Sequence, residues 1–142
     1  MFLENDVIGA IFSHFAHGGN RWCILLIGLL LCHYLADFCL TTKWMIRAKA
    51  DASSYLPILA HAAVHAVLMT IVLFAFGVKT EGCIAGFIIQ LVSHFIIDTS
   101  KALLTCHITV LKDNTKKPYW MVYGLDQFLH ILVIVGMTVY LL

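Results

Sequence analysis

Residues 22–40 read WCILLIGLLLCHYLADFCL, an almost unbroken apolar stretch that begins after Arg21 and ends before Lys43. Within it, the only side chains that carry a charge or an imidazole are those of His33 and Asp37. A run of roughly 20 apolar residues, folded as an α-helix, matches the ~30 Å hydrocarbon core of a bilayer. A membrane-spanning strand would alternate apolar and polar residues, and this stretch does not. We therefore predict that it forms a transmembrane helix.

The composition of the whole chain agrees with a membrane protein. Of its 142 residues, 61% are hydrophobic and 12% are charged, whereas a soluble domain carries about a quarter of its residues as charges. So few charges could not cover the surface of a soluble monomer, and disorder requires the opposite bias. The net charge of +1 argues against nucleic acid as a partner. The five cysteines show no CxxC spacing and are interpreted as small apolar side chains.

Three further apolar stretches have the length of a membrane span. With the first one taken as about 22–41, we expect the others at about 57–77, 82–106 and 119–142. Residues 2–17 instead place their apolar side chains near one helical face, which predicts an amphipathic helix on the membrane surface. The predicted fold is an all-α, integral membrane four-helix bundle of up-down-up-down topology, forming a single domain over residues 1–142.

The distribution of basic residues predicts an orientation. Two segments, one after the first span and one between the third and the fourth, carry seven of the nine basic residues: Lys43, Arg47, Lys49, Lys101, Lys112, Lys116 and Lys117. Loops rich in lysine and arginine stay in the cytoplasm. We therefore expect both termini on the extracytoplasmic side.

The ionisable residues inside the predicted spans occur in pairs, each with a spacing of four residues. Side chains four apart lie one above the other on the same face of a helix. The pairs, one per span, are His33 and Asp37, His61 and His65, His94 and Asp98, and Asp126 and His130. With alternating helix directions, all four pairs fall at a similar depth on the cytoplasmic side. An ionisable side chain buried in a membrane span costs free energy, so four pairs at a similar depth predict a common site.

Five imidazoles and three carboxylates in a low dielectric are the donors that divalent transition metals use. We predict a metal site with zinc favoured and manganese or iron as alternatives. Eight potential ligands exceed the three or four that one zinc ion takes from a protein, which makes a site with two ions plausible. The alternative is a hydrogen-bonded network of histidine and aspartate without a metal. Where Asp98 or Asp126 is not a ligand, it is a candidate general base.

Four blocks of the sequence resemble a known family. They are His33-Tyr-Leu-Ala-Asp37 with the following Thr42-Lys43-Trp44, His61-Ala-Ala-Val-His65, Ser93-His94-Phe-Ile-Ile-Asp98 with Lys101, and Asp126-Gln127-Phe-Leu-His130. In this order they resemble the domain-of-unknown-function family 3307 of small bacterial and phage membrane proteins. The resemblance implies a polytopic helical protein, here expected in the bacterial inner membrane, with these polar positions as its defining features. It implies no activity.

A buried metal site close to the membrane surface favours a metal-dependent hydrolase. Its substrate would be a lipid, a lipid-linked phosphate or another molecule that enters from the cytoplasmic leaflet, with Lys43, Lys49 and Lys101 as candidates to hold an anionic headgroup. One alternative is a structural or interaction protein that the metal stabilises. Another is a transporter of divalent metal or protons, although a single layer of polar groups makes a site rather than a path. Membrane lipid is the expected partner. The sequence leaves open whether the chain forms a homo-oligomer.

Overall fold

The computed structural model of the chain describes residues 21–141, and every regular element in that part is a helix. The first span, Arg21–Cys39, ends in the π-helix η1, and the other elements follow in chain order: η1 (Leu35–Cys39), α2 (Lys43–Asp51), α3 (Tyr55–Ala75), α4 (Thr80–His107), η2 (Thr109–Lys112) and α5 (Lys117–Leu141). Four of these helices are long and apolar enough to cross a membrane. The predicted all-α fold with four spans is thus confirmed. The surface helix expected at residues 2–17 lies outside the described residues.

Helix α2 occupies a segment that we expected to form a loop. Thr42 begins it as an N-cap, because its side chain accepts a hydrogen bond of 3.4 Å from the backbone N–H of Met45. The helix ends at Ala52, whose φ of 52° lies in the left-handed region. Met45 and Ala48 are its buried residues, so α2 is a short amphipathic element. A search for apolar stretches long enough to cross a membrane does not detect a helix as short as α2.

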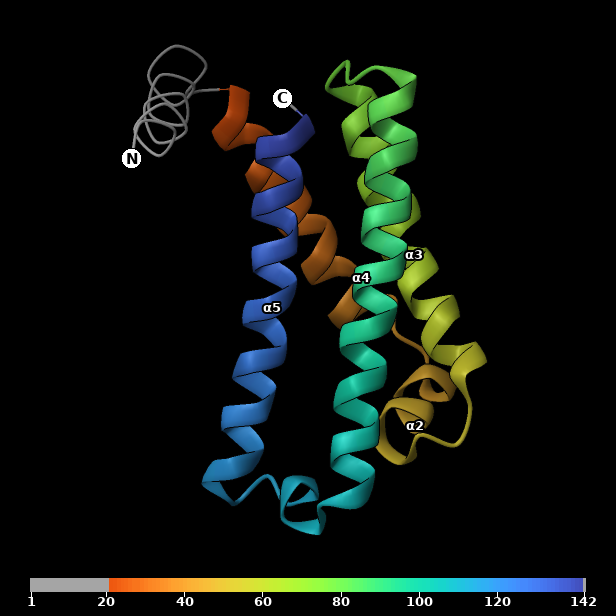
Figure 1. The fold of residues 1–142 in the computed structure, drawn as a ribbon, viewed down its shortest axis with the longest axis vertical. Helices are drawn as coiled ribbons and strands as arrows, with labels where there is room; N and C mark the ends of the chain where they lie inside the picture. Colours follow the sequence, from red (N-terminus) through yellow and green to blue (C-terminus); the bar gives the residue numbers. More distant parts are fainter. Residues whose placement is uncertain (1–20, 142) are drawn as a thin grey trace, which may run out of the picture.

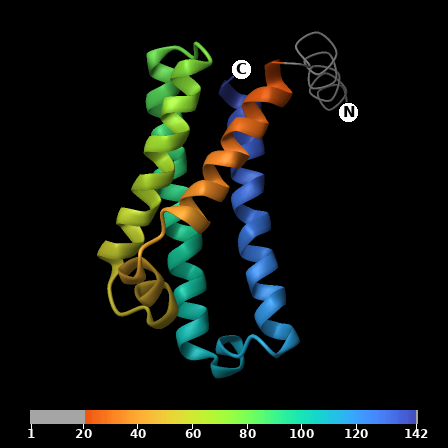
Figure 2. The same cartoon turned by 180° about the vertical axis from the view of Figure 1, so that it is seen from behind.

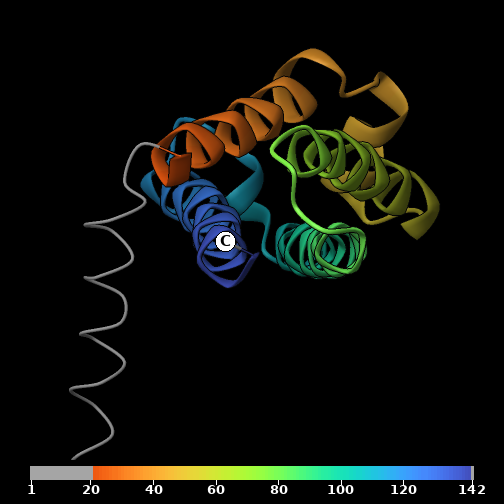
Figure 3. The same cartoon turned by 90° about the horizontal axis from the view of Figure 1, so that it is seen from above.

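The four spans are arranged around a common centre, as the view along the bundle shows (Figure 3). Helix α4 packs along both α3 and α5 (Figure 1), and the first span crosses obliquely between α3 and α5 (Figure 2). Arg21, Val78 and Leu141 line one cavity and therefore lie at one end of the bundle, called here the Arg21 end. Helix α2 and η2 lie together at the other end, called here the α2 end. The direction in which each helix would cross a membrane stays a prediction.

The apolar core lies toward the Arg21 end. Its main cluster joins all four spans and contains Leu25, Leu29, Cys32, Met69, Leu73, Cys83, Ile134 and Met137. A small second cluster of Ala48, Ile58 and Ala102 fixes α2 against α3 and α4. Large apolar side chains also face outward along the spans, for example Ile71 and Phe74 of α3, which are 59% and 72% exposed. An apolar exterior of this kind suits contact with lipid rather than water.

Gly86 of α4 permits the close approach of three helices. A Cβ atom at this position would lie 2.5 Å from Leu73 Cδ1 of α3 and 3.1 Å from Leu141 Cδ1 of α5. Leu73 is fully buried in the main core cluster and therefore has little room to move away. The absence of a side chain at Gly86 thus allows α4 to lie close to α3 and α5.

Candidate metal centre

The eight residues of the predicted pairs meet inside the bundle, between the main apolar core and the α2 end. We call them the His/Asp cluster. His61, His65 and His94 are 0% exposed, and the other five members are buried or nearly so. The imidazole rings pack against one another, with centroids 3.7 Å apart for His65 and His94 and 4.2 Å apart for His94 and His130. The side chains of the four pairs therefore converge inside the bundle.

One group of four side chains within the cluster could hold a metal ion: Asp37, His61, His65 and His94. Asp37 Oδ1 lies 3.0 Å from His61 Nε2 and 3.4 Å from His65 Nε2, and the two histidine nitrogens are 3.1 Å apart. Two ring nitrogens that face each other at this distance repel through their lone pairs unless a proton or a cation lies between them. A proton on one of the two nitrogens, or a cation shared by both, would therefore stabilise the arrangement.

These separations are close to, and in two cases slightly shorter than, those between the ligand atoms of a tetrahedral ion. Zinc binds histidine nitrogen at about 2.0–2.1 Å and carboxylate oxygen at about 2.0–2.2 Å, so two of its ligand atoms are about 3.3–3.5 Å apart. The three distances within Asp37, His61 and His65 are 3.0, 3.1 and 3.4 Å. They approximate one face of such a tetrahedron, with His94 as the fourth member of the group. The four possible ligand atoms all lie within 4.8 Å of one another, so this group could hold a metal ion.

A second group consists of His94, Asp98 and His130. His94 Nε2 lies 3.3 Å from Asp98 Oδ2, and His130 Nε2 lies 4.0 Å from Asp98 Oδ1. Among the described residues, neither of these two Nε2 atoms has a hydrogen-bond partner although both are buried. Because His94 belongs to both groups and offers one lone pair as a neutral imidazole, we expect one strongly bound ion rather than two equal ones.

In three histidines of the two groups, His61, His94 and His130, the ring nitrogen Nδ1 faces a polar partner. His130 Nδ1 donates to the backbone carbonyl of Asp126 at 2.8 Å, and His61 Nδ1 lies 3.4 Å from the hydroxyl of Thr41. His94 Nδ1 lies 3.3 Å from the side-chain amide of Gln90, whose carbonyl oxygen has no other partner in the described part of the chain. Rotating this amide by 180° would let it accept the Nδ1 proton. Such bonds leave Nε2 free for a metal, as is usual for metal-binding histidines.

Asp37 lies in the π-helical turn η1, at the end of the first span. Single π-helical turns inside α-helices frequently occur at functional sites, because the extra residue per turn redirects a side chain. The hydroxyl of Thr41 lies 2.8 Å from the carbonyl of Ala36 and 2.7 Å from that of Asp37, and it bonds to both. Thr41 therefore closes this turn and contacts His61 at the same time.

Two of the eight predicted ligands belong to neither group. His33 Nε2 lies 3.4 Å from Asp37 Oδ2 and donates to Gln127 Oε1 at 3.3 Å. The amide nitrogen of Gln127 donates to Asp37 Oδ2 at 3.3 Å and to Asp126 Oδ2 at 3.1 Å. Gln127 thus connects the first span to α5, and its side-chain amide bonds only to members of the cluster in the described structure. His33 and Asp126 lie next to the candidate ligands but are not among them.

Two lysines contact the cluster from the α2 end. Lys49 Nζ lies 2.7 Å from Asp98 Oδ2 and 3.7 Å from Asp37 Oδ1, and Lys101 Nζ lies 2.8 Å from Asp126 Oδ2. With neutral imidazoles, the three carboxylates exceed these two lysines by one negative charge. A divalent cation would reverse the sign of the site. Lys43, the third lysine that we expected near a headgroup, is exposed and does not line either of the cavities described at this end.

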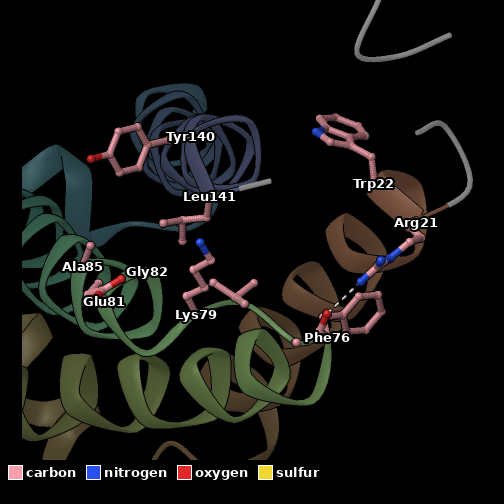
Figure 4. A pocket seen from close by; sticks show the side chains of 11 residues that line it. Arg21, Trp22, Phe76, Lys79, Glu81, Gly82, Ala85, Tyr140 and Leu141 are labelled. Carbon is pink, nitrogen blue, oxygen red and sulfur yellow. Dashed lines mark hydrogen bonds between the residues drawn. The ribbon is translucent and has the colours of Figure 1, made fainter. Parts of the chain in front are cut away.

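A cavity of about 190 Å³ adjoins the cluster at the same end. Its lining includes Asp37, Thr41, Asp126 and Gln127. A larger cavity of about 590 Å³ lies at the Arg21 end, where Arg21 Nη2 donates to the carbonyl of Phe76 at 2.9 Å (Figure 4). Its lining includes Glu81 and Lys79 but none of the cluster residues. Access to the candidate metal centre is therefore from the α2 end, and the apolar core closes the opposite side.

The sequence prediction missed Thr41, Gln90 and Gln127 as parts of the site. Gln90 offered a signal, since it precedes His94 by four residues on α4, the same spacing that links His94 to Asp98. Gln127 follows Asp126 directly and would normally face away from it, so only the tertiary structure reveals its bonds. Ser93, which precedes His94, bonds to the carbonyl of Ile89 at 2.6 Å within its own helix.

Fold and site together define a class: a helical bundle with four candidate membrane spans around buried His/Asp groups that could hold a metal ion. The chain belongs to the family described as protein of unknown function (DUF3307), and the match covers residues 25–142. The family suggested by the four sequence blocks is thus confirmed. Neither a curated protein nor a solved structure matches the chain.

Proposed function

We propose that this chain is a membrane metalloprotein of the bacterial inner membrane that hydrolyses a lipid, a lipid-linked phosphate or a similar membrane-proximal substrate. The observation that carries the proposal is the convergence of Asp37, His61, His65 and His94, whose possible ligand atoms all lie within 4.8 Å of one another. Zinc is the favoured ion, and manganese or iron is the alternative. When bound, such an ion lowers the pKa of water and polarises a carbonyl or phosphoryl oxygen.

Asp126 is the side chain best placed to accept a proton from water. It lines the 190 Å³ cavity and belongs to neither group of candidate ligands. Its Oδ2 accepts hydrogen bonds from Lys101 and Gln127, which hold the carboxylate in place, whereas its Oδ1 has no hydrogen-bond partner among the described residues. Because Oδ1 is buried, it would take a proton only from a water that enters beside it, and on this basis Asp126 is our candidate general base. Asp98, the other predicted base, is a candidate ligand instead.

The first experiment determines the metal content of protein purified in detergent, by elemental analysis. We expect about one equivalent of a divalent transition metal in the wild type and its loss in His61→Ala. The matched control is His107→Ala, because His107 is an exposed histidine at the end of α4 and lies outside the cluster. A wild-type protein that takes up no divalent metal, or a His61→Ala variant that keeps its full content, would show that the centre is a hydrogen-bonded network.

Hydrolysis needs a separate measurement, because a metal could also act only as a structural link. One observation favours that second candidate: the cluster draws residues from all four spans, so a bound ion would tie the helices together. Turnover of a soluble carboxyl or phosphate ester by the metal-loaded protein, lost in Asp126→Asn with the metal content intact, supports the hydrolase. Full metal content without turnover, and a melting temperature that falls on chelation, would favour the structural role.

A further inference from the structure

A second cavity of about 360 Å³ lies at the α2 end, between α2, α4, η2 and α5. Its polar lining is basic and hydroxylic and consists of Lys49, Lys101, Lys112, Thr105, Tyr119 and Tyr123. The rest of its wall is apolar, and no carboxylate lines it. We call it the lysine cavity. Its volume lies within the usual range for pockets that bind small molecules.

The lysine cavity adjoins the 190 Å³ cavity beside the metal centre. It shares Ile46, Lys49, Lys101 and Tyr123 with the 190 Å³ cavity that reaches Asp37 and Asp126. Lys49 and Lys101 therefore stand between the two spaces, and Lys101 also packs its ammonium 4.8 Å from the centre of the Tyr123 ring. A molecule in the lysine cavity would reach the candidate metal ligands by passing these two side chains.

The chemistry of the lining selects an anion that accepts several hydrogen bonds. Lysine ammonium groups bind phosphate as point charges, and hydroxyl groups of threonine and tyrosine donate to its oxygens. The apolar wall suits a hydrocarbon portion of the same molecule. A neutral or cationic head would find three lysines and no acid in this lining, and it would therefore be disfavoured.

Metal occupancy and anion binding should be coupled electrostatically. Without a metal, Lys49 is paired with Asp98 and Lys101 with Asp126, so both charges are already compensated. A divalent cation held by Asp37, His61, His65 and His94 would add two positive charges beside these pairs and make the net charge of the site positive. Anion affinity should therefore rise when the metal is bound.

We propose that the lysine cavity binds the phosphate ester group of the substrate, with its three lysines facing the phosphate and with the positive charge of the metal-loaded centre strengthening the binding. This proposal rests on the metal centre proposed above, and it narrows the substrate class to phosphate esters. The phosphate could belong to a lipid headgroup or to a soluble molecule, since the two share the same chemistry.

The test measures binding rather than turnover. Inorganic phosphate, dihexanoyl phosphatidic acid and dihexanoylglycerol are titrated by calorimetry into detergent-purified protein, with and without one equivalent of zinc. We expect the two phosphates to bind more tightly to the zinc-loaded protein than to the zinc-free protein, and dihexanoylglycerol not to bind. Tighter binding of phosphatidic acid than of phosphate assigns the site to a lipid headgroup, and equal binding assigns it to a soluble phosphate.

The matched variants use Lys112, which lines the cavity, is exposed and takes part in none of the ion pairs of the cluster. Lys112→Gln should weaken phosphate binding roughly two- to fivefold, as expected for an exposed charge pair, and Lys112→Arg should restore it. The control is Lys116→Gln, an exposed lysine of the same connecting segment outside the cavity. Equal phosphate affinity in Lys112→Gln and wild type, or equal affinity with and without zinc, would overturn the inference.

The outcomes also separate this inference from the proposed function. Zinc binding and ester hydrolysis without phosphate affinity would refute the lysine cavity and leave the hydrolase intact. Zinc-dependent phosphate binding that Lys112→Gln weakens, in a protein without hydrolytic turnover, would support the lysine cavity and refute the hydrolase. A protein that binds no zinc refutes both.

Discussion

Thr41 offers the sharpest test of whether the His/Asp cluster is organised around a metal. Its hydroxyl closes the π-helical turn through the carbonyls of Ala36 and Asp37 and lies 3.4 Å from His61 Nδ1. Thr41→Val keeps a β-branched side chain of similar size and removes the hydroxyl. The variant therefore removes the polar partner of a candidate ligand but leaves every candidate ligand present.

The expected size of the effect follows from the geometry. Loss of the partner of a metal-binding histidine typically weakens metal affinity 10- to 100-fold. Because the contact to His61 is long, we expect the lower end, about tenfold or about 1.4 kcal/mol. The carbonyls of Ala36 and Asp37 also lose their donor, which should lower the free energy of unfolding by about 1 kcal/mol.

The neighbouring residue provides the control. Thr42→Val removes the N-cap of α2 and should also cost about 1 kcal/mol of stability, but Thr42 has no contact with His61 in the described structure. Zinc affinity is measured by competition with a chelator of known affinity, and stability by thermal unfolding in detergent. Thr41→Ser, which retains the hydroxyl, should bind zinc like the wild type. Equal zinc affinity in Thr41→Val and Thr42→Val would refute the role of Thr41 in orienting His61.

Two predictions concern the scaffold. Gly86→Ala should be less stable than Gly136→Ala by about 1–3 kcal/mol in thermal unfolding. The new Cβ meets Leu73 and Leu141 in the first variant, whereas it meets nothing within 4 Å in the second. Equal stability of the two variants would contradict the close helix approach at Gly86. Ala52→Gly should stabilise the protein by up to about 1 kcal/mol, since Ala52 has a φ of 52°. Ala50→Gly inside α2 should lower stability by roughly 0.5–1 kcal/mol, and a loss of similar size in both variants would argue against the left-handed cap.

The sequence alone determined the fold class and the identity of the polar cluster. Hydropathy marks the four spans because a helix in a bilayer needs a long apolar exterior whatever its neighbours are. The spacing of four in pairs such as His94 and Asp98 is also a local property, since one helical turn puts both side chains on one face. These features depend on residues close in the chain, and the sequence contains them completely.

The tertiary structure decided which members of the His/Asp cluster are candidate metal ligands and which are not. The rotation of the first span and α5 about their axes places Asp37 against His61 and His65, but it leaves His33 and Asp126 bound to Gln127. The π-helical turn at Asp37, the short helix α2 with Lys49, and the approach permitted by Gly86 all contribute to this outcome. Ligand geometry depends on differences of about 1 Å between helices that are distant in sequence. Those distances are set by packing, which spacing along one helix does not encode.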